Sequence, residues 1–168
     1  NVVCIIGDGG MNMNIQELQT LKNYNVGVKV VILNNHIYGI TKAFQKVNFE
    51  GRMEACGPVG YAPPDFVKVA ESYGLPTMRI ESGMDYEVVR SQINEFLNHD
   101  GPMIIDVDCH EYHKYDPRLI GWETPIEDMY PYLDREEFLS NMYIKPLDIS
   151  LNPEQLVYPV EFPNEDWD

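Results

Sequence analysis

The sequence predicts an α/β fold in which a parallel sheet carries helices on both of its faces. Short apolar runs rich in β-branched residues recur along the chain, and segments with helical spacing separate them. The expected strands are residues 2–6, 28–33, 77–80 and 103–107. Strands that alternate with helices form parallel sheets, in which ligands bind at the carboxyl ends of the strands. A functional site is therefore expected at that edge.

The first expected strand, Val2–Ile6, is a continuous apolar run, which predicts burial on both faces of the sheet. Cys4 lies in this run and Cys109 follows the last strand, so both are expected to be buried thiols. Together with Cys56 they form an odd, scattered set that does not indicate disulfides. A reducing, cytoplasmic location is the resulting expectation.

Helices are expected between these strands. Residues 14–24 carry apolar side chains at a helical spacing, and residues 85–99 read as a long amphipathic helix. The inner side of that long helix is expected to hold Val88, Val89, Ile93, Phe96 and Leu97. Shorter helices are expected at 41–45, 65–73 and 136–142. Residues 47–61, which carry glycines and charges, are predicted to be a loop and the least ordered internal segment in the absence of ligand.

The composition argues against several classes of function. The chain has 168 residues, of which 44% are hydrophobic, which suggests one domain with a sizeable core. No apolar run approaches the length of a membrane span. Lys and Arg number 12 against 27 Asp and Glu, which gives a formal net charge of −15. Such acidity argues against nucleic acid and anionic membranes as partners, because phosphate binding needs clustered cations.

Two polar motifs follow the first two expected strands. Gly7-Asp8-Gly9-Gly10 comes directly after the first strand, and Asn34-Asn35 ends the second. A carboxylate and a carboxamide on neighbouring strand ends supply the oxygen ligands that Mg²⁺ prefers. The glycines allow backbone N–H groups to approach a phosphate closely, and a helix N-terminus favours anions. The two motifs together indicate a site for magnesium and a diphosphate.

The same motifs carry a family resemblance. Gly7-Asp8-Gly9 followed by Asn34-Asn35 resembles the two-part signature of thiamine-diphosphate (ThDP) enzymes. Residues 13–20, 28–35 and 38–40 are similar to the C-terminal, cofactor-binding domain of the acetolactate-synthase group. The resemblance extends from residue 1 to about residue 108. Gly-Asp-Gly alone would be ordinary turn chemistry, whereas the pair of motifs is specific.

The resemblance implies a ligand set for the site. Mg²⁺ would be held by the side chains of Asp8 and Asn35 and by the backbone carbonyl of Ile37, and diphosphate oxygens and a water would complete its shell. The residues expected to contact ThDP are Gly7, Asp8, Gly9, Gly10, Met11, Asn35, Ile37, Tyr38, Gly39 and Ile40. No catalytic residue is assigned in this chain.

The resemblance also implies how the protein is divided. Residues 1–108 would form the diphosphate- and Mg-binding core, and the proline-rich residues 109–168 an irregular extension that packs on it. Upstream domains, one of which carries the glutamate that activates ThDP in the family, are expected to be absent from this chain. The chain alone is therefore expected to be inactive. It is expected to form a homo-oligomer, and the full-length protein could also hold FAD.

Enzymes of this group act on 2-keto acids or related carbonyl substrates by C–C bond cleavage or carboligation, so a lyase or transferase is expected. Ile40 and Phe44 stand where acetolactate synthases carry Met and Trp, and they either shape a substrate channel or belong to the core. The sequence of residues 122–129 favours another member of the group, a hydrolase or a sugar-pathway enzyme. A non-catalytic diphosphate-binding assembly subunit is a further alternative, although it would not need both Asp8 and Asn35.

Overall fold

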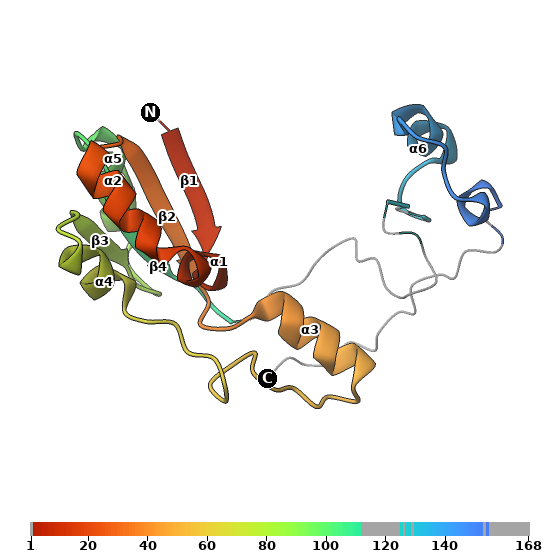
Figure 1. Ribbon diagram of the computed structural model, residues 1–168, viewed down its shortest axis with the longest axis horizontal. Coiled ribbons are helices and arrows are strands. Elements are labelled where there is room, and N and C mark those ends of the chain that lie inside the picture. Colours follow the sequence, from red (N-terminus) through yellow and green to blue (C-terminus); the bar gives the residue numbers. More distant parts are fainter. Residues whose placement is uncertain (1, 112–124, 126, 129, 153, 155–168) are drawn as a thin grey trace. The chain divides into compact units, whose positions relative to one another are not determined.

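A four-stranded parallel sheet forms the centre of the structure (Figure 1). The computed structural model describes residues 2–111, 125, 127–128, 130–152 and 154. The chain divides into two compact units, Asn1–His113 and Lys114–Asp168, and the sheet belongs to the first. Its strands lie in the order β1-β2-β4-β3. They are β1 (Val2–Gly7), β2 (Val28–Asn34), β3 (Thr77–Ile80) and β4 (Met103–Asp108).

The register of the strands brings their carboxyl ends to one edge. Gly7 of β1 pairs with Leu33 of β2, and Asn34 pairs with Asp108 of β4. Both sequence motifs therefore lie at the carboxyl edge of the sheet, where the topology predicts a site.

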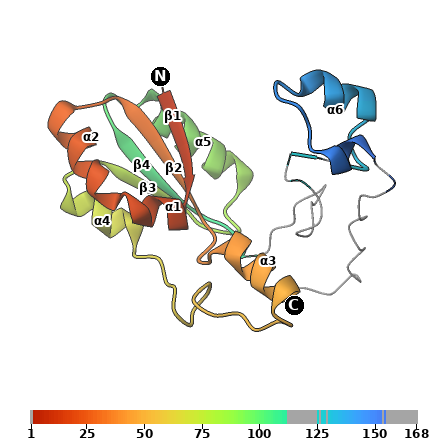
Figure 2. The same cartoon turned by 45° about the vertical axis from the view of Figure 1, so that its right-hand side comes forward.

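Helices cover both faces of the sheet, as the sequence predicts (Figure 2). One face packs against α1 (Asp8–Met13), α2 (Leu18–Tyr24) and α4 (Phe66–Ser72) through a core that includes Leu18, Ile32 and Phe66. The other face packs against α5 (Tyr86–Asn98), whose Phe96 contacts residues of β3 and β4. The predicted fold class is confirmed.

The first helical region differs from the prediction of one helix over residues 14–24. Helix α1 begins at Asp8, so two of the motif glycines lie in its first turn instead of in a loop. The backbone leaves the helical region at Asn14, with φ −131° and ψ 31°, and a 3₁₀ turn (η1, Ile15–Glu17) leads into α2. Burial of Met11 in the core anchors α1 and outweighs the low helix propensity of glycine.

The prediction that β1 is buried on both faces is wrong. Val2 and Ile5 are exposed, and Cys4, expected to be a buried thiol, is exposed as well, while Cys109 is half-buried and Cys56 is buried. The reason is position. β1 is an edge strand, and α5 packs over β3 and β4 at the other side of the sheet.

Two other helices differ in detail from the prediction. On α5, Val89, Phe96 and Leu97 pack against the sheet, whereas Val88 and Ile93, which were expected on the inner side, are exposed. Helix α3 (Gly39–Asn48) is longer than the predicted 41–45 and extends beyond the carboxyl edge of the sheet (Figure 1).

The second unit is organised around a buried ion pair. Asp128 is fully buried, and the Arg135 guanidinium donates to its two carboxylate oxygens at 2.7 and 3.1 Å. Arg135 begins α6 (Arg135–Asn141), close to the predicted 136–142, and Asp134 caps that helix by accepting from the Glu136 amide at 2.8 Å. A 3₁₀ turn, η2 (Asp148–Leu151), follows.

Most residues of the 122–129 segment, and many others of the second unit, lie outside the described residues, so the expectations that concern them stay predictions. None of the helices in the described part of the chain has the length and apolarity needed to span a membrane.

Candidate functional site

A tight turn at the end of β2 presents the second polar motif. The Asn34 side chain accepts from the His36 amide at 3.3 Å, which is the hydrogen bond of an Asx turn. His36 adopts φ 61°, a left-handed conformation that is uncommon outside glycine. The His36 ring makes a 2.8 Å hydrogen bond to Asp108 at the end of β4, and this bond ties the turn to the sheet. The hydrogen bonds to Asn34 and Asp108 therefore stabilise a left-handed turn conformation at a residue that is not glycine.

Three predicted metal ligands converge beside this turn. As placed, the Asn35 side-chain oxygen lies 3.0 Å from the Ile37 carbonyl oxygen and 3.1 Å from Asp8 Oδ1, so three oxygen atoms face one another. A cation stabilises such an arrangement, whereas in its absence exchange of the carboxamide oxygen and nitrogen would turn both contacts into hydrogen bonds donated by Asn35. We call Asp8, Asn35 and the Ile37 carbonyl the oxygen cluster. Only one of its members, Asp8, is a His, Cys, Asp or Glu. The described residues contain no group of three or more side chains of these four types able to hold a metal.

Asp8 carries the negative charge of the oxygen cluster. It follows β1, begins α1 and is only 2% exposed. Tyr61 donates its hydroxyl to Asp8 Oδ2 at 3.0 Å. Within the described part of the chain, no Lys, Arg or His forms an ion pair with Asp8. A buried carboxylate that meets only neutral groups is a favourable place for a metal ion.

The residues after Asp8 are buried to different degrees. Gly9 is buried, and a Cβ there would lie 2.7 Å from Cδ1 of Tyr38, so the close approach of the Tyr38 ring requires glycine. Gly10 is exposed, whereas the side chain of Met11 belongs to the core. Any contact of Met11 with a diphosphate would therefore come from its backbone.

Burial and the neighbouring Asp8 carboxylate both act on Tyr61. Burial contributes most, and together the two raise the pKa of the Tyr61 phenol well above its ordinary value. The hydroxyl thus stays protonated at neutral pH and remains a hydrogen-bond donor. Its ring stacks on Tyr38, with 3.9 Å between the ring centroids.

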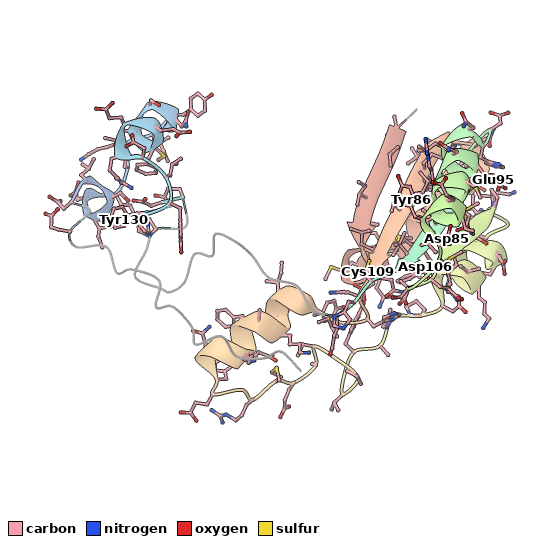
Figure 3. All side chains as sticks on the ribbon, turned by 180° about the vertical axis from the view of Figure 1, so that it is seen from behind. Asp85, Tyr86, Glu95, Asp106, Cys109 and Tyr130 are labelled. Atoms are coloured by element: carbon pink, nitrogen blue, oxygen red, sulfur yellow. The ribbon has the colours of Figure 1, made fainter. Side chains whose placement is uncertain are left out.

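A second group of charged residues lies near the same edge, in the carboxyl-terminal halves of β3 and β4 and at the start of α4. Arg79 donates to Asp106 at 2.9 Å and to Asp65 at 2.7 Å. Asp106 also accepts from the Asn34 carboxamide at 3.2 Å, which links this group to the turn after β2. We call Asp65, Arg79 and Asp106 the ion-paired cluster. Figure 3 labels Asp106 and Cys109 near this end of the sheet.

The remaining predicted residues lie at the start of α3. Tyr38 precedes the helix, Gly39 begins it, and Ile40 in its first turn is 70% exposed. Phe44 is 40% exposed and contacts Phe49 edge-on. The alternative that Ile40 belongs to the core is therefore wrong for this chain, whereas Phe44 is partly exposed and packs against Phe49.

Sequence reasoning missed the residues that support the oxygen cluster. Tyr61 lies 53 positions from Asp8, in a segment without regular structure, so no periodicity could have indicated it. His36 directly follows the Asn34-Asn35 motif, but the partner of its side chain, Asp108, is 72 positions away. Asp106 carried the one usable signal, since it is a charged residue in the middle of an apolar strand.

Comparison with known proteins identifies the family. Residues 1–107 match the family described as "Thiamine pyrophosphate enzyme, C-terminal TPP binding domain". The chain belongs to this family. The matched residues include the sheet up to the penultimate residue of β4, both polar motifs and every member of the oxygen cluster. The family is therefore the one that the paired motifs resemble, and the relatives of the chain place it in the acetolactate-synthase-like group.

Relatives of this TPP-binding domain are much longer proteins. An acetolactate synthase of Arthrospira platensis is 40% identical over 106 residues, which are 63% of this chain and 18% of that protein. A probable acetolactate synthase large subunit of Methanococcus aeolicus is 40% identical over 105 residues, 62% of this chain and 17% of that protein. The chain thus spans less than a fifth of these two relatives.

A solved structure supports the same assignment. The ThDP-dependent 4-hydroxybenzoylformate decarboxylase of Rhodococcus jostii RHA1 superposes with a TM-score of 0.58 at 29% sequence identity. The match covers 66% of this chain and 20% of the decarboxylase chain. Similar proteins thus include both synthases and a decarboxylase.

Proposed function

We propose that this TPP-binding domain holds the diphosphate of ThDP through Mg²⁺ at the oxygen cluster. The observation that supports the proposal most strongly is the position of Asn35, whose carboxamide lies 3.0 Å from the Ile37 carbonyl oxygen and 3.1 Å from Asp8 Oδ1. With the carboxamide oxygen on this side, as the structure places it, three oxygen ligands would face one ion. Mg²⁺ binds such sites with one or two carboxylates and takes its other ligands from phosphates and water.

The residues present fit the cofactor. Asp8 would balance part of the charge of the metal, and the first turn of α1 would offer backbone N–H groups of Gly9 and Gly10 to the diphosphate. When bound, ThDP supplies the electron sink for reactions at a carbonyl carbon. The exposed side chain of Ile40 would then be available to contact the substrate or the domain that covers it.

The proposed activity of the full-length protein is C–C bond cleavage or carboligation on 2-keto acids or related carbonyl compounds. Membership of the TPP-binding family and the names of the similar proteins support this class of reaction. Homo-oligomerisation, FAD in the full-length protein, contacts with other domains of the same polypeptide and a cytoplasmic location stay predictions.

Calorimetry on the full-length protein tests the proposed cofactor site. ThDP should bind in the presence of Mg²⁺ and lose its affinity when EDTA removes the metal. Asp8→Ala should abolish the Mg²⁺-dependent binding, because it removes the one carboxylate of the oxygen cluster. The matched control is Asp100→Ala, which changes an exposed aspartate ahead of β4, at the opposite edge of the sheet. Unchanged ThDP affinity in Asp8→Ala would contradict the proposal.

A further inference from the structure

Tyr61 is the residue outside the predicted ligand set that touches the oxygen cluster most directly. It is 6% exposed, and its hydroxyl donates to Asp8 Oδ2 at 3.0 Å. The other carboxylate oxygen, Oδ1, faces Asn35 at 3.1 Å. The two carboxylate oxygens therefore have different partners, one from the neighbouring strand end and one from a distant part of the chain.

Several contacts near the oxygen cluster fix the position of Tyr61. The Tyr61 ring stacks on Tyr38 at 3.9 Å between centroids, and the Tyr38 amide donates to the Cys56 carbonyl at 2.8 Å. The Tyr61 amide donates to the Gly57 carbonyl at 2.9 Å. Although the segment before α4 lacks regular structure, Tyr61 is thus held by residues next to Ile37.

The same segment is tied to α3. Gln45 donates to the Glu54 carbonyl at 3.0 Å, and the Glu54 amide donates back to the Gln45 side chain at 2.8 Å. These reciprocal hydrogen bonds, and the backbone hydrogen bond between Tyr38 and Cys56, hold the segment before Tyr61 next to α3 and the oxygen cluster. The hydroxyl is thereby aimed at Asp8 from a fixed direction.

The hydrogen bond from Tyr61 to Asp8 Oδ2 restricts rotation of the carboxylate. Oδ1, the oxygen that would bind the metal, therefore keeps its direction toward Asn35 and the Ile37 carbonyl. Mg²⁺ demands nearly ideal octahedral geometry, whereas Ca²⁺ accepts irregular shells and longer distances. Groups that orient a metal ligand in this way typically change metal affinity by 10- to 100-fold when they are removed.

We infer that Tyr61 is a positioning residue that fixes the Asp8 carboxylate in the direction required by Mg²⁺. The inference rests on the proposed cofactor site and goes beyond it, because it assigns a role to a residue outside both motifs. Tyr61 acts through Asp8 and does not itself bind the metal.

Replacement of Tyr61 by phenylalanine tests this role, because it removes the hydroxyl and keeps the stacked ring. In calorimetry on the full-length protein with ThDP present, Tyr61→Phe should weaken Mg²⁺ binding about tenfold. Ca²⁺ binding should weaken less, so the preference for Mg²⁺ over Ca²⁺ should fall. The matched control is Tyr73→Phe, which removes a hydroxyl from a tyrosine packed against the core and should leave both affinities unchanged.

The outcomes separate failure of the role inferred for Tyr61 from failure of the proposed cofactor site. Absence of Mg²⁺-dependent ThDP binding in the unmodified protein would overturn both. Normal binding there with equal Mg²⁺ affinity in Tyr61→Phe would overturn the inference alone. Equal weakening of Mg²⁺ and Ca²⁺, or failure of Tyr61→Phe to fold, would assign the hydroxyl to the stability of the site and would also overturn it.

Discussion

Two groups of polar residues lie at the carboxyl edge of one sheet, and each contains a buried aspartate. In the ion-paired cluster, Asp106 is 3% exposed and pairs with Arg79. In the oxygen cluster, Asp8 is 2% exposed and, among the described residues, meets only the hydroxyl of Tyr61 and the carboxamide of Asn35. Arg79 balances the charge of Asp106, whereas no cationic side chain in the described part of the chain pairs with Asp8. This difference supports the proposal that Asp106 is a structural aspartate and Asp8 a metal ligand.

The largest expected effect comes from removal of the internal cation. Arg79→Met leaves Asp106 buried without its partner, which should lower the free energy of unfolding by about 3 kcal/mol. Urea unfolding measures this loss. Arg90→Met is the matched control, because Arg90 is an exposed arginine of α5 that lies 4.0 Å from Glu87. Its loss should change stability by about 0–1 kcal/mol. Equal losses of unfolding free energy in the two variants would show that Arg79 does not balance a buried charge.

Neutralising each aspartate in turn should give opposite results. Asp106→Asn removes one of the two carboxylate partners of Arg79 and should destabilise the metal-free protein by about 2 kcal/mol. Asp8→Asn removes a buried charge that has no basic partner in the described structure, and it should leave stability unchanged or raise it by about 1 kcal/mol. Urea unfolding in EDTA compares them. Similar destabilisation by both variants would show that Asp8, like Asp106, is a structural residue.

A smaller effect is expected from pH. Burial of Asp65 opposes its ionisation, but hydrogen bonds from Lys68 and Arg79 outweigh this effect and lower its pKa to about 2, from an ordinary value of 3.8. Because the pKa is lower in the folded state, ionised Asp65 stabilises the fold above about pH 4. This contribution is lost as the pH falls toward 2.

Asp65→Asn isolates the charge, since asparagine is also a good N-cap for α4. Unfolding free energies measured between pH 5 and pH 2, a range chosen around these pKa values, should fall less steeply in this variant. An identical slope in both proteins would count against Asp65 as a member of the ion-paired cluster.

Much of the fold could be predicted because its strands are apolar runs bounded by helices. β3 was located at its observed bounds, Thr77–Ile80, and the alternation with helices predicted a parallel sheet. Burial was harder to predict. β1 and β4 are both mainly apolar, yet β4 is buried between neighbours and β1 is an exposed edge. Local sequence carries the strand signal, whereas burial depends on which elements pack on the strand.

The motif half of the site was predictable for a similar reason. Asp8 and Asn35 end neighbouring strands, and parallel pairing brings such ends together. The supporting half was not predictable, because His36–Asp108 and Tyr61–Asp8 join residues 72 and 53 positions apart. No local spacing encodes those contacts. They depend on strand order and on the path of the segment before α4.

The central claim is that the oxygen cluster holds Mg²⁺ together with ThDP, and a crystal structure of the full-length protein with both bound tests it most directly. The metal should lie about 2.0–2.1 Å from Asp8, from the Asn35 side-chain oxygen and from the Ile37 carbonyl oxygen. The Asn35 carboxamide should present its oxygen to the ion. A metal bound elsewhere, or an Asn35 nitrogen that donates to Asp8 in the complex, would contradict the account.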